Sequence, residues 1–233
     1  MRTGEDDQRY RRRREAGEAS RARTRQRLLD AADELFREQG YVATTVAQIV
    51  RRAGVSVQTL YLTWGSKRAL LRAAADAAAT GRDQPPAPDQ WRAAVRDSIE
   101  RDAAGPGTAA RLEALAGAFT SLAERAAPYW AIYRQAAAVD PDIAEDWVAT
   151  VQARRATLTE VADALPDDGV DRRAVADTLF ALAGPDTYAL LTEHAGYTSD
   201  DYRAWLARTL VASVAAPHQR RRSRSGRERP SGS

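Results

Sequence analysis

TTVAQIVRRAGVSVQTLYLTWGSKR, residues 44–68, is the stretch of the sequence that decides the fold. Thr45 is a good N-cap, because its hydroxyl can accept a hydrogen bond from an otherwise unpaired N–H of the first helical turn. Apolar residues then recur at helical spacing as far as Ala53, and Gly54 follows, where a left-handed backbone suits glycine. Ser56 is expected to begin a second helix that ends at Gly65, so the spacing predicts a helix-turn-helix.

The second helix of this motif carries polar side chains on its outer face. Leu60 and Trp64 are predicted to point inward together with Val57. The outward groups are short hydroxyls, one amide and one phenol, which can form hydrogen bonds with base edges and phosphates in a major groove. A helix hairpin that binds no DNA can have the same spacing, so the spacing alone leaves both alternatives open.

The whole string closely resembles the DNA-binding domain of TetR-family transcriptional repressors, continuously from about Thr24 to Ala75. The resemblance rests on Gly40-Tyr41, Thr44-Thr45-Val46, Ile49, Ala53-Gly54-Val55-Ser56, Thr59-Leu60-Tyr61, Trp64, Gly65-Ser66-Lys67 and Leu70-Leu71. Two departures stand out: Val50 occupies a position that is usually Ala, and Leu62-Thr63 replaces a pair that often includes Tyr or His facing phosphates.

The resemblance implies which residues bind DNA. Gln58 and Thr59 are expected to read bases, and the hydroxyls and the ammonium around them to hold phosphates. Lys67, the only lysine of the chain, falls in the first turn of the next helix, where backbone N–H groups and an ammonium together favour an anion. The full expected set is Thr45, Ser56, Val57, Gln58, Thr59, Tyr61, Thr63 and Lys67.

Charge is distributed unevenly along the chain. Residues 1–27 hold ten Arg and five acidic residues, and residues 216–233 hold six Arg and one Glu, so each end carries +5. Because the whole chain is +3, residues 28–215 carry −7. We predict a disordered basic arm over 1–23 and a disordered Arg-rich tail over 216–233. Such segments either follow the DNA backbone or remain solvated, and the sequence leaves both open.

The remaining sequence predicts an all-α protein. An N-terminal three-helix helix-turn-helix domain with its linking helix is expected over 24–80. A breaker-rich loop at 81–88 marks the domain boundary, and a helical ligand-binding and dimerisation domain follows over 89–215. Within this second domain, helices are predicted over 89–104, 108–126, 128–139, 140–165, 171–193 with an interruption at Gly184-Pro185, and 198–215.

The last two of these helices resemble the pair through which TetR-family subunits dimerise. Each has an apolar face, and a helix-turn-helix protein needs two heads to bind a two-fold operator. The alternative is that both faces are used within one chain. The expected interface residues are Leu179, Leu182, Leu190, Trp205, Leu206 and Leu210.

A small-molecule effector is the usual input of the family, and aromatic residues lie on the helices that would surround its pocket. Aromatic residues at helical spacing are also ordinary core residues, so this prediction stays open. The candidate pocket residues are Trp91, Phe119, Trp130, Tyr133, Arg134 and Trp147, which suggest an apolar or aromatic effector.

The sequence argues against an enzyme. His194 and His218 have no neighbours spaced as a catalytic triad or a metal site, and no glycine-rich phosphate loop is present. We therefore expect no catalytic residues, no metal and no cofactor. With no cysteine, no apolar run of membrane-spanning length and no signal-peptide core at the start, a cytoplasmic, nucleoid-associated protein without a membrane partner is expected.

The predicted function is that of a sequence-specific, homodimeric repressor that a small molecule releases from double-stranded operator DNA. The alternative is an architectural DNA-binding protein that uses its basic ends and has no effector. A regulator prefers one sequence by orders of magnitude, whereas binding through the ends ignores sequence and weakens steeply with salt.

Overall fold

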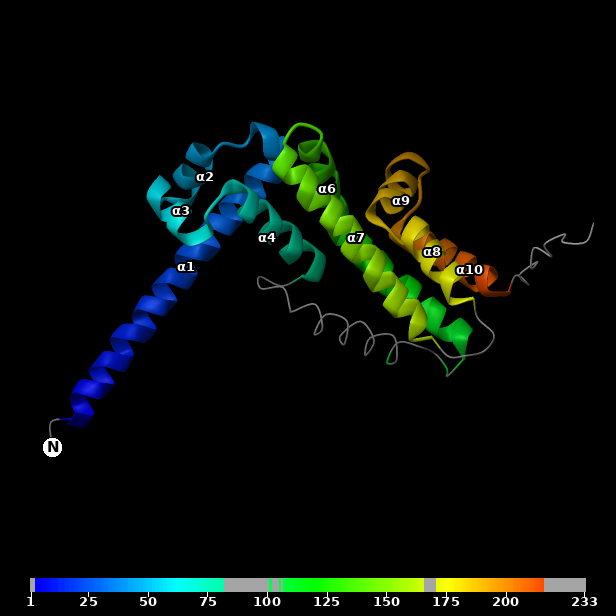
Figure 1. The fold of residues 1–233 in the computed structure, drawn as a ribbon, viewed down its shortest axis with the longest axis horizontal. Coiled ribbons are helices and arrows are strands. Elements are labelled where there is room, and N and C mark those ends of the chain that lie inside the picture. Colours follow the sequence, from blue (N-terminus) through cyan, green and yellow to red (C-terminus); the bar gives the residue numbers. More distant parts are fainter. Residues whose placement is uncertain (1–2, 82–100, 102–104, 106, 166–170, 216–233) are drawn as a thin grey trace, which may run out of the picture.

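The computed structural model describes residues 3–81, 101, 105, 107–165 and 171–215, and all regular structure in these ranges is helical (Figure 1). The elements are α1 (Thr3–Ala43), α2 (Val46–Ala53), α3 (Val57–Trp64), α4 (Lys67–Thr80), α6 (Thr108–Ala137), α7 (Pro141–Asp163), α8 (Arg172–Leu182), α9 (Pro185–Ala189), a π-helical turn (Leu190–His194) and α10 (Ser199–Ala215). The predicted all-α fold is confirmed. The helix predicted over 89–104, with Trp91, and the tail over 216–233 lie outside the described residues.

The helix ends of the predicted helix-turn-helix form as expected. Thr45 accepts a hydrogen bond from the N–H of Gln48, whose side chain in turn accepts one from the N–H of Thr45. This reciprocal capping box satisfies two N–H groups at the start of α2. Gly54 then ends α2 with φ 65° and ψ 41°, in the left-handed region, and Ser56 caps α3. Local sequence therefore determines where these short helices begin and end.

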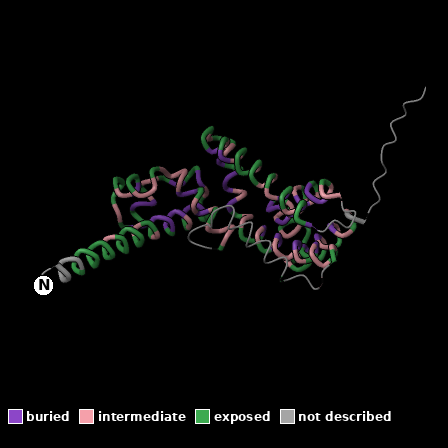
Figure 2. Tube along the Cα trace, turned by 60° about the horizontal axis from the view of Figure 1, so that its bottom comes forward, coloured by how far each residue is buried: buried purple, intermediate pink, exposed green. Residues whose placement is uncertain are grey.

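Helix α1 begins much earlier than predicted. Its first twenty residues are helical, whereas the sequence predicted a disordered arm over 1–23 and a helix start near Thr24. The side chains from Gln8 to Arg23 remain exposed, so no tertiary packing holds this extension (Figure 2). It is rich in Arg, Glu and Ala, which have high helix propensity, and Arg14 pairs with Glu18 one turn later at 3.0 Å. The prediction treated the lack of burial as a lack of secondary structure.

Helix α6 also differs from the prediction, which ended one helix near Ala126 and began another at Pro128. The structure has one helix over Thr108–Ala137 with Pro128 inside it. An internal proline loses a hydrogen bond and costs about 3 kcal/mol. Buried residues precede and follow it, among them Ala123 and Tyr129, so packing on both sides outweighs that local cost.

Two hydrophobic cores divide the molecule, and α6 and α7 contribute to both. The first core contains the buried faces of α1 to α4 together with Tyr129, Ile132, Tyr133 and Ala136 of α6 and Ile143 of α7. The second contains the other halves of α6 and α7 with α8, α9 and α10. The end of α6 is thus part of the core of helices α1 to α4, which links the two halves of the chain by direct packing.

The prediction of the dimer interface is wrong for three of its six residues. Leu179, Leu206 and Leu210 are completely buried within the one chain, where α8 packs with α7 and α10, and α10 also packs with α6. They belong to the core and are not available to a second subunit. Leu182 and Trp205 are partly buried against the same core, and Leu190 is 58% exposed. The periodicity identified the apolar faces correctly, but three of the six residues pack within the chain, and the interface prediction for the other three stays a prediction.

Among the helices of the described residues, none combines the length and the apolar character needed to cross a membrane.

Candidate DNA-binding surface and effector pocket

One face of helix α3 packs against the rest of the protein, and the other face is exposed to solvent. Leu60 is completely buried, whereas Tyr61 is 51% exposed and Gln58 is also exposed. Val57, predicted to point inward, is 45% exposed and therefore belongs to the outer face. Leu62, which the sequence reasoning did not select, is 81% exposed. The helical spacing of the sequence could have indicated that Leu62 lies on the outer face of α3.

The hydroxyl groups of this surface have local partners. Ser56 accepts a hydrogen bond from the N–H of Thr59 at 3.1 Å, and the two hydroxyls lie 2.8 Å apart. Thr45 is exposed and serves its own capping box. Thr63 is half-buried, and its carbonyl accepts a hydrogen bond from Arg25. Gln58 and Tyr61 therefore carry the polar groups of α3 that are most available to a ligand.

Arg25 of α1 fixes the C-terminal end of α3. Its guanidinium lies 3.5 Å from the centroid of the Trp64 ring, and the Trp64 indole N–H donates to the Arg25 carbonyl at 3.2 Å. A cation over a tryptophan face is attractive because of the ring quadrupole. This clamp holds α3 in place relative to α1, so Arg25 orients the candidate reading helix.

Lys67 is placed differently from the expectation of a phosphate contact. Its Nζ donates to the carbonyls of Thr44 at 2.8 Å and Tyr41 at 3.0 Å, and lies 3.9 Å from the centroid of the Tyr41 ring. Burial lowers the pKa of Lys67. The ammonium thus joins the start of α4 to the end of α1. The sequence shows a lone lysine but not the carbonyls that surround it.

The linking helix α4 is tied to α7 by an ionic cluster. The Asp146 side chain, only 8% exposed, accepts from Arg68 Nε at 2.6 Å and from Arg72 at 2.9 Å. The Arg68 guanidinium, followed by that of Arg72, holds the pKa of Asp146 below its usual range. A second tie joins α6 to α1, where the Tyr129 hydroxyl donates to the Asp33 carboxylate.

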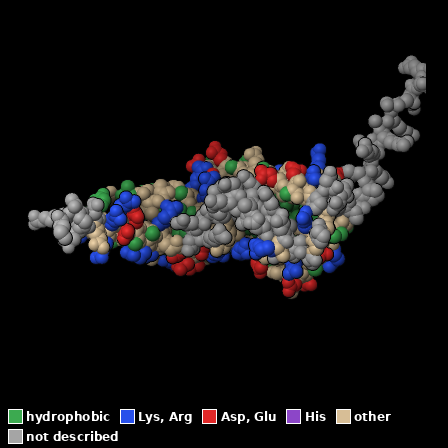
Figure 3. All heavy atoms as spheres, turned by 90° about the horizontal axis from the view of Figure 1, so that it is seen from below, with side chains coloured by type: hydrophobic (Ala, Val, Ile, Leu, Met, Phe, Trp, Pro, Cys, Tyr) green, Lys and Arg blue, Asp and Glu red, His purple; other side chains and the backbone are tan. Residues whose placement is uncertain are grey.

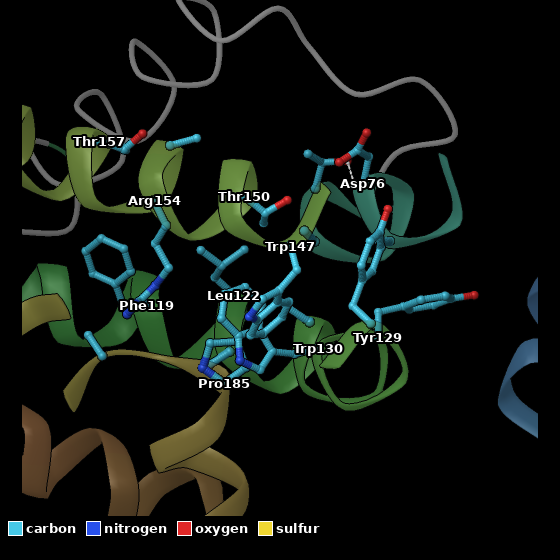
Figure 4. A pocket seen from close by; sticks show the side chains of 18 of the residues that line it. Asp76, Phe119, Leu122, Tyr129, Trp130, Trp147, Thr150, Arg154, Thr157 and Pro185 are labelled. Carbon is cyan, nitrogen blue, oxygen red and sulfur yellow. Dashed lines mark hydrogen bonds between the residues drawn. The ribbon is translucent and has the colours of Figure 1, made fainter. Parts of the chain in front are cut away.

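A cavity of about 400 Å³ lies between α4, α6 and α7, with Pro185 of α9 at one side (Figure 4). Pockets for small molecules generally have this size. Four predicted pocket residues, Phe119, Trp130, Tyr133 and Trp147, line it. Arg134 does not, because it pairs with Asp186 on the surface. The sequence analysis missed three charged lining residues, namely Arg72, Asp76 and Arg154.

The aromatic residues form an apolar wall in the cavity. The ring centroids of Trp130 and Trp147 lie 4.5 Å apart, and the rings are inclined by 59°. Tyr129 and Tyr133 also line it, and burial, the largest effect, raises the pKa of both phenols. These phenols are therefore neutral, and the cavity offers a largely apolar surface with a few charged groups at its edge.

Comparison with known proteins places residues 28–74, from the middle of α1 into α4, in the family described as bacterial regulatory proteins, tetR family. No curated protein sequence matches the chain.

Several solved structures share the fold of this chain at low sequence identity. A TetR-family transcriptional regulator from Mesorhizobium loti has 16% identity and a TM-score of 0.58, over 84% of this chain and 96% of that one. NalD of Pseudomonas aeruginosa, the secondary repressor of the MexAB-OprM efflux pump, has 18% identity and a TM-score of 0.58, over 83% and 98%. FadR of Bacillus subtilis, in complex with stearoyl-CoA, has 19% identity and a TM-score of 0.53, over 83% and 99%.

TetR-family regulators are DNA-binding proteins rather than enzymes, and the family match falls on the helix-turn-helix whose caps and exposed face are described above. Residues 28–74 therefore match the model of the TetR family of bacterial regulatory proteins, and the chain has a fold that TetR-family transcriptional regulators share.

Proposed function

We propose that the protein is a homodimeric, sequence-specific transcriptional repressor that a small-molecule effector releases from its operator. The observation that carries this proposal is α3, a capped helix held on α1 by Leu60 and the Arg25–Trp64 clamp with Gln58 and Tyr61 exposed. A helix held in this way can enter a major groove as a rigid unit. Residues 24–80 would bind DNA, and residues 89–215 would bind the effector and the second subunit.

Within this proposal, each polar residue of the motif has a role. Gln58 and Thr59 read base edges, since an amide can form two hydrogen bonds with adenine. Thr45, Tyr61 and Thr63 contact phosphates. Val57 and Leu62 offer apolar contacts to thymine methyl groups. Lys67 acts by holding α4 against the end of α1, with its ammonium already bonded to two carbonyls.

The cavity has physical routes to the DNA-binding helices. Arg72 lines the cavity and also bonds to Asp146, while Tyr129 lines it and bonds to Asp33 of α1. An effector that moves either side chain changes a contact between the two cores. Release of DNA requires a coupling free energy of only about 1–3 kcal/mol between the sites. FadR of Bacillus subtilis, which shares this fold, forms a complex with stearoyl-CoA, and this supports a small-molecule ligand for the present chain.

The proposal is tested by selecting randomised duplexes with the purified full-length protein at about 0.15 M salt. We expect enrichment of one palindromic site and a loss of roughly 1–3 kcal/mol at one base pair in Gln58→Ala. Gln8→Ala, on the exposed extension of α1, is the matched control and should retain the preference.

The architectural alternative has support in the distribution of charge. Figure 3 shows Lys and Arg side chains along the α1 end of the molecule, and residues 1–27 carry +5. If unselected DNA is recovered, and affinity disappears when residues 1–23 and 216–233 are removed, the basic ends dominate binding and the repressor proposal fails.

A further inference from the structure

Arg154 is a cation on the wall of the cavity, and it has no ion-paired carboxylate among the residues that the structure describes. Its guanidinium donates to the carbonyls of Phe180 at 2.9 Å and Leu179 at 3.2 Å, at the end of α8. Across the described ranges of the chain, no carboxylate forms an ion pair with it. Burial lowers the pKa of Arg154, and the charges of Tyr202 and Asp186 oppose this effect only in part.

The neighbouring arginines are all paired. Arg155, the next residue on α7, bonds to Asp177, and Arg134 bonds to Asp186. Arg72, the other arginine of the cavity, bonds to Asp146. Arg154 therefore differs from each of them, because among the described residues its charge is met by carbonyl oxygens and not by an ion-paired carboxylate.

The absence of a side chain at Gly184 leaves room for the Arg154 guanidinium. A Cβ atom on Gly184 would lie 2.8 Å from an Arg154 terminal nitrogen, closer than real contacts of this kind. Gly184 is buried between α8 and α9. A side chain at residue 184 would therefore displace the guanidinium from its present position.

The charged groups of the cavity are separated along its length. Figure 4 shows Arg154 beside Phe119 at one end and Asp76 at the opposite end, with Trp130 and Trp147 between them. Burial raises the pKa of Asp76, so a buried site disfavours its negative charge. A ligand with a single anionic group therefore has one favourable orientation, with that group at Arg154 and its apolar part on the tryptophans.

We propose that the cavity binds an amphipathic organic monoanion, a carboxylate with an aromatic or aliphatic body, and that Arg154 binds the carboxylate. Two of the five guanidinium N–H donors bond to carbonyls, which leaves donors for the ligand. A charge-assisted hydrogen bond from arginine to carboxylate is stronger than a neutral one. The binding itself is independent of the proposed repressor function, and only the role of the ligand as an effector rests on that function.

The test measures binding of matched ligand pairs to the full-length protein without DNA, by titration calorimetry and tryptophan fluorescence. The pairs are naphthoate with naphthamide and decanoate with decanamide, which differ in charge and hardly in shape. We expect at least one carboxylate to bind about 10-fold or more tightly than its amide, a factor equivalent to about 1.4 kcal/mol.

Variants then assign this preference to Arg154. Arg154→Met keeps the aliphatic stem and should abolish the preference, whereas Arg154→Lys should retain part of it. Gly184→Ala should reduce it by displacing the guanidinium. Arg155→Met is the matched control, since Arg155 pairs with Asp177 and neither residue lines the cavity. Asp76→Asn should leave carboxylate binding unchanged or make it tighter.

Three results would overturn the proposal: equal binding of carboxylate and amide, unchanged carboxylate binding in Arg154→Met, or no saturable carboxylate binding up to about 1 mM. Any of these would mean that Arg154 serves only the C-terminal carbonyls of α8. Because the assay contains no DNA, failure here is separate from failure of operator selection. A carboxylate that binds as expected but leaves operator affinity unchanged would contradict the effector role alone.

Discussion

Asp146 of α7 and Arg68 of α4 form a hydrogen-bonded ion pair at 2.6 Å across the boundary between the linking helix and the helical body. The carboxylate is 8% exposed, while the guanidinium is 34% exposed. Arg72 shares the same carboxylate from the next turn of α4. A buried acceptor held by two arginines fixes the direction of α4 more firmly than an isolated surface pair, which contributes little.

Asp146→Asn should lower the melting temperature by about 2–4 °C, because the amide offers one acceptor oxygen in place of a charged pair. The measurement is thermal unfolding followed by circular dichroism. Asp142→Asn is the control, since Asp142 is 75% exposed and 3.7 Å from Arg68, and its melting temperature should not change. Equal shifts in melting temperature in the two variants would show that the buried position of Asp146 contributes nothing to stability.

The same pair should make stability depend on pH in the acid range. The folded protein holds the pKa of Asp146 below the ordinary value, chiefly through Arg68. Its contribution is therefore complete above the unfolded pKa of about 3.9 and is lost as the pH falls through the lower folded pKa. The difference in melting temperature between the wild type and Asp146→Asn should be constant above about pH 5 and should shrink below about pH 4. A difference that grows with acidification would contradict this sign.

Lys67→Met should destabilise the fold by about 1–2 kcal/mol, since the carbonyls of Thr44 and Tyr41 lose a charged donor. Denaturant unfolding measures this loss. If Lys67 were mainly a phosphate ligand, stability would be unchanged and the salt dependence of DNA binding would weaken by about one counterion. Arg51→Met, on the exposed last turn of α2, is the control for loss of one positive charge near the motif.

Leu206→Ala should destabilise the folded chain by about 2–5 kcal/mol, because Leu206 is completely buried under α6 and α8. Leu190→Ser, at a position 58% exposed, should leave that stability nearly unchanged. If the proposed dimer forms through the C-terminal helices, Leu190→Ser should raise its dissociation constant. Unfolding and sedimentation equilibrium measure the two effects, and an unchanged dissociation constant would place the dimer contact elsewhere.

Local features of the sequence predicted the helix-turn-helix accurately. The cap at Thr45, the positive φ at Gly54 and the cap at Ser56 each depend on a few adjacent residues, so they can be read without knowing the rest of the fold. Four of the six pocket residues were identified because aromatic side chains at helical spacing mark a helix face. Whether that face borders a cavity or a solid core depends on the neighbouring helices.

The failures have different causes. The extension of α1 is helical although its described side chains are exposed, because local helix propensity is sufficient there. Helix α6 continues through Pro128 because buried residues lie on both sides of the proline. A pattern of apolar residues shows that Leu206 and Leu210 must be buried, but not whether α6 or a second subunit covers them.

The amino-acid sequence alone is enough to predict the all-α fold, the helix-turn-helix and its caps, because short-range hydrogen bonds and helical periodicity specify them. Three features required the folded arrangement: Lys67 bonds to carbonyls, Asp146 receives two arginines, and Arg154 lines a cavity with no ion-paired carboxylate among the described residues. The partners in these contacts lie more than twenty residues apart in the chain. The charge state and hydrogen bonds of a side chain depend on the groups that folding brings beside it. Residue type and spacing along the chain do not specify those groups.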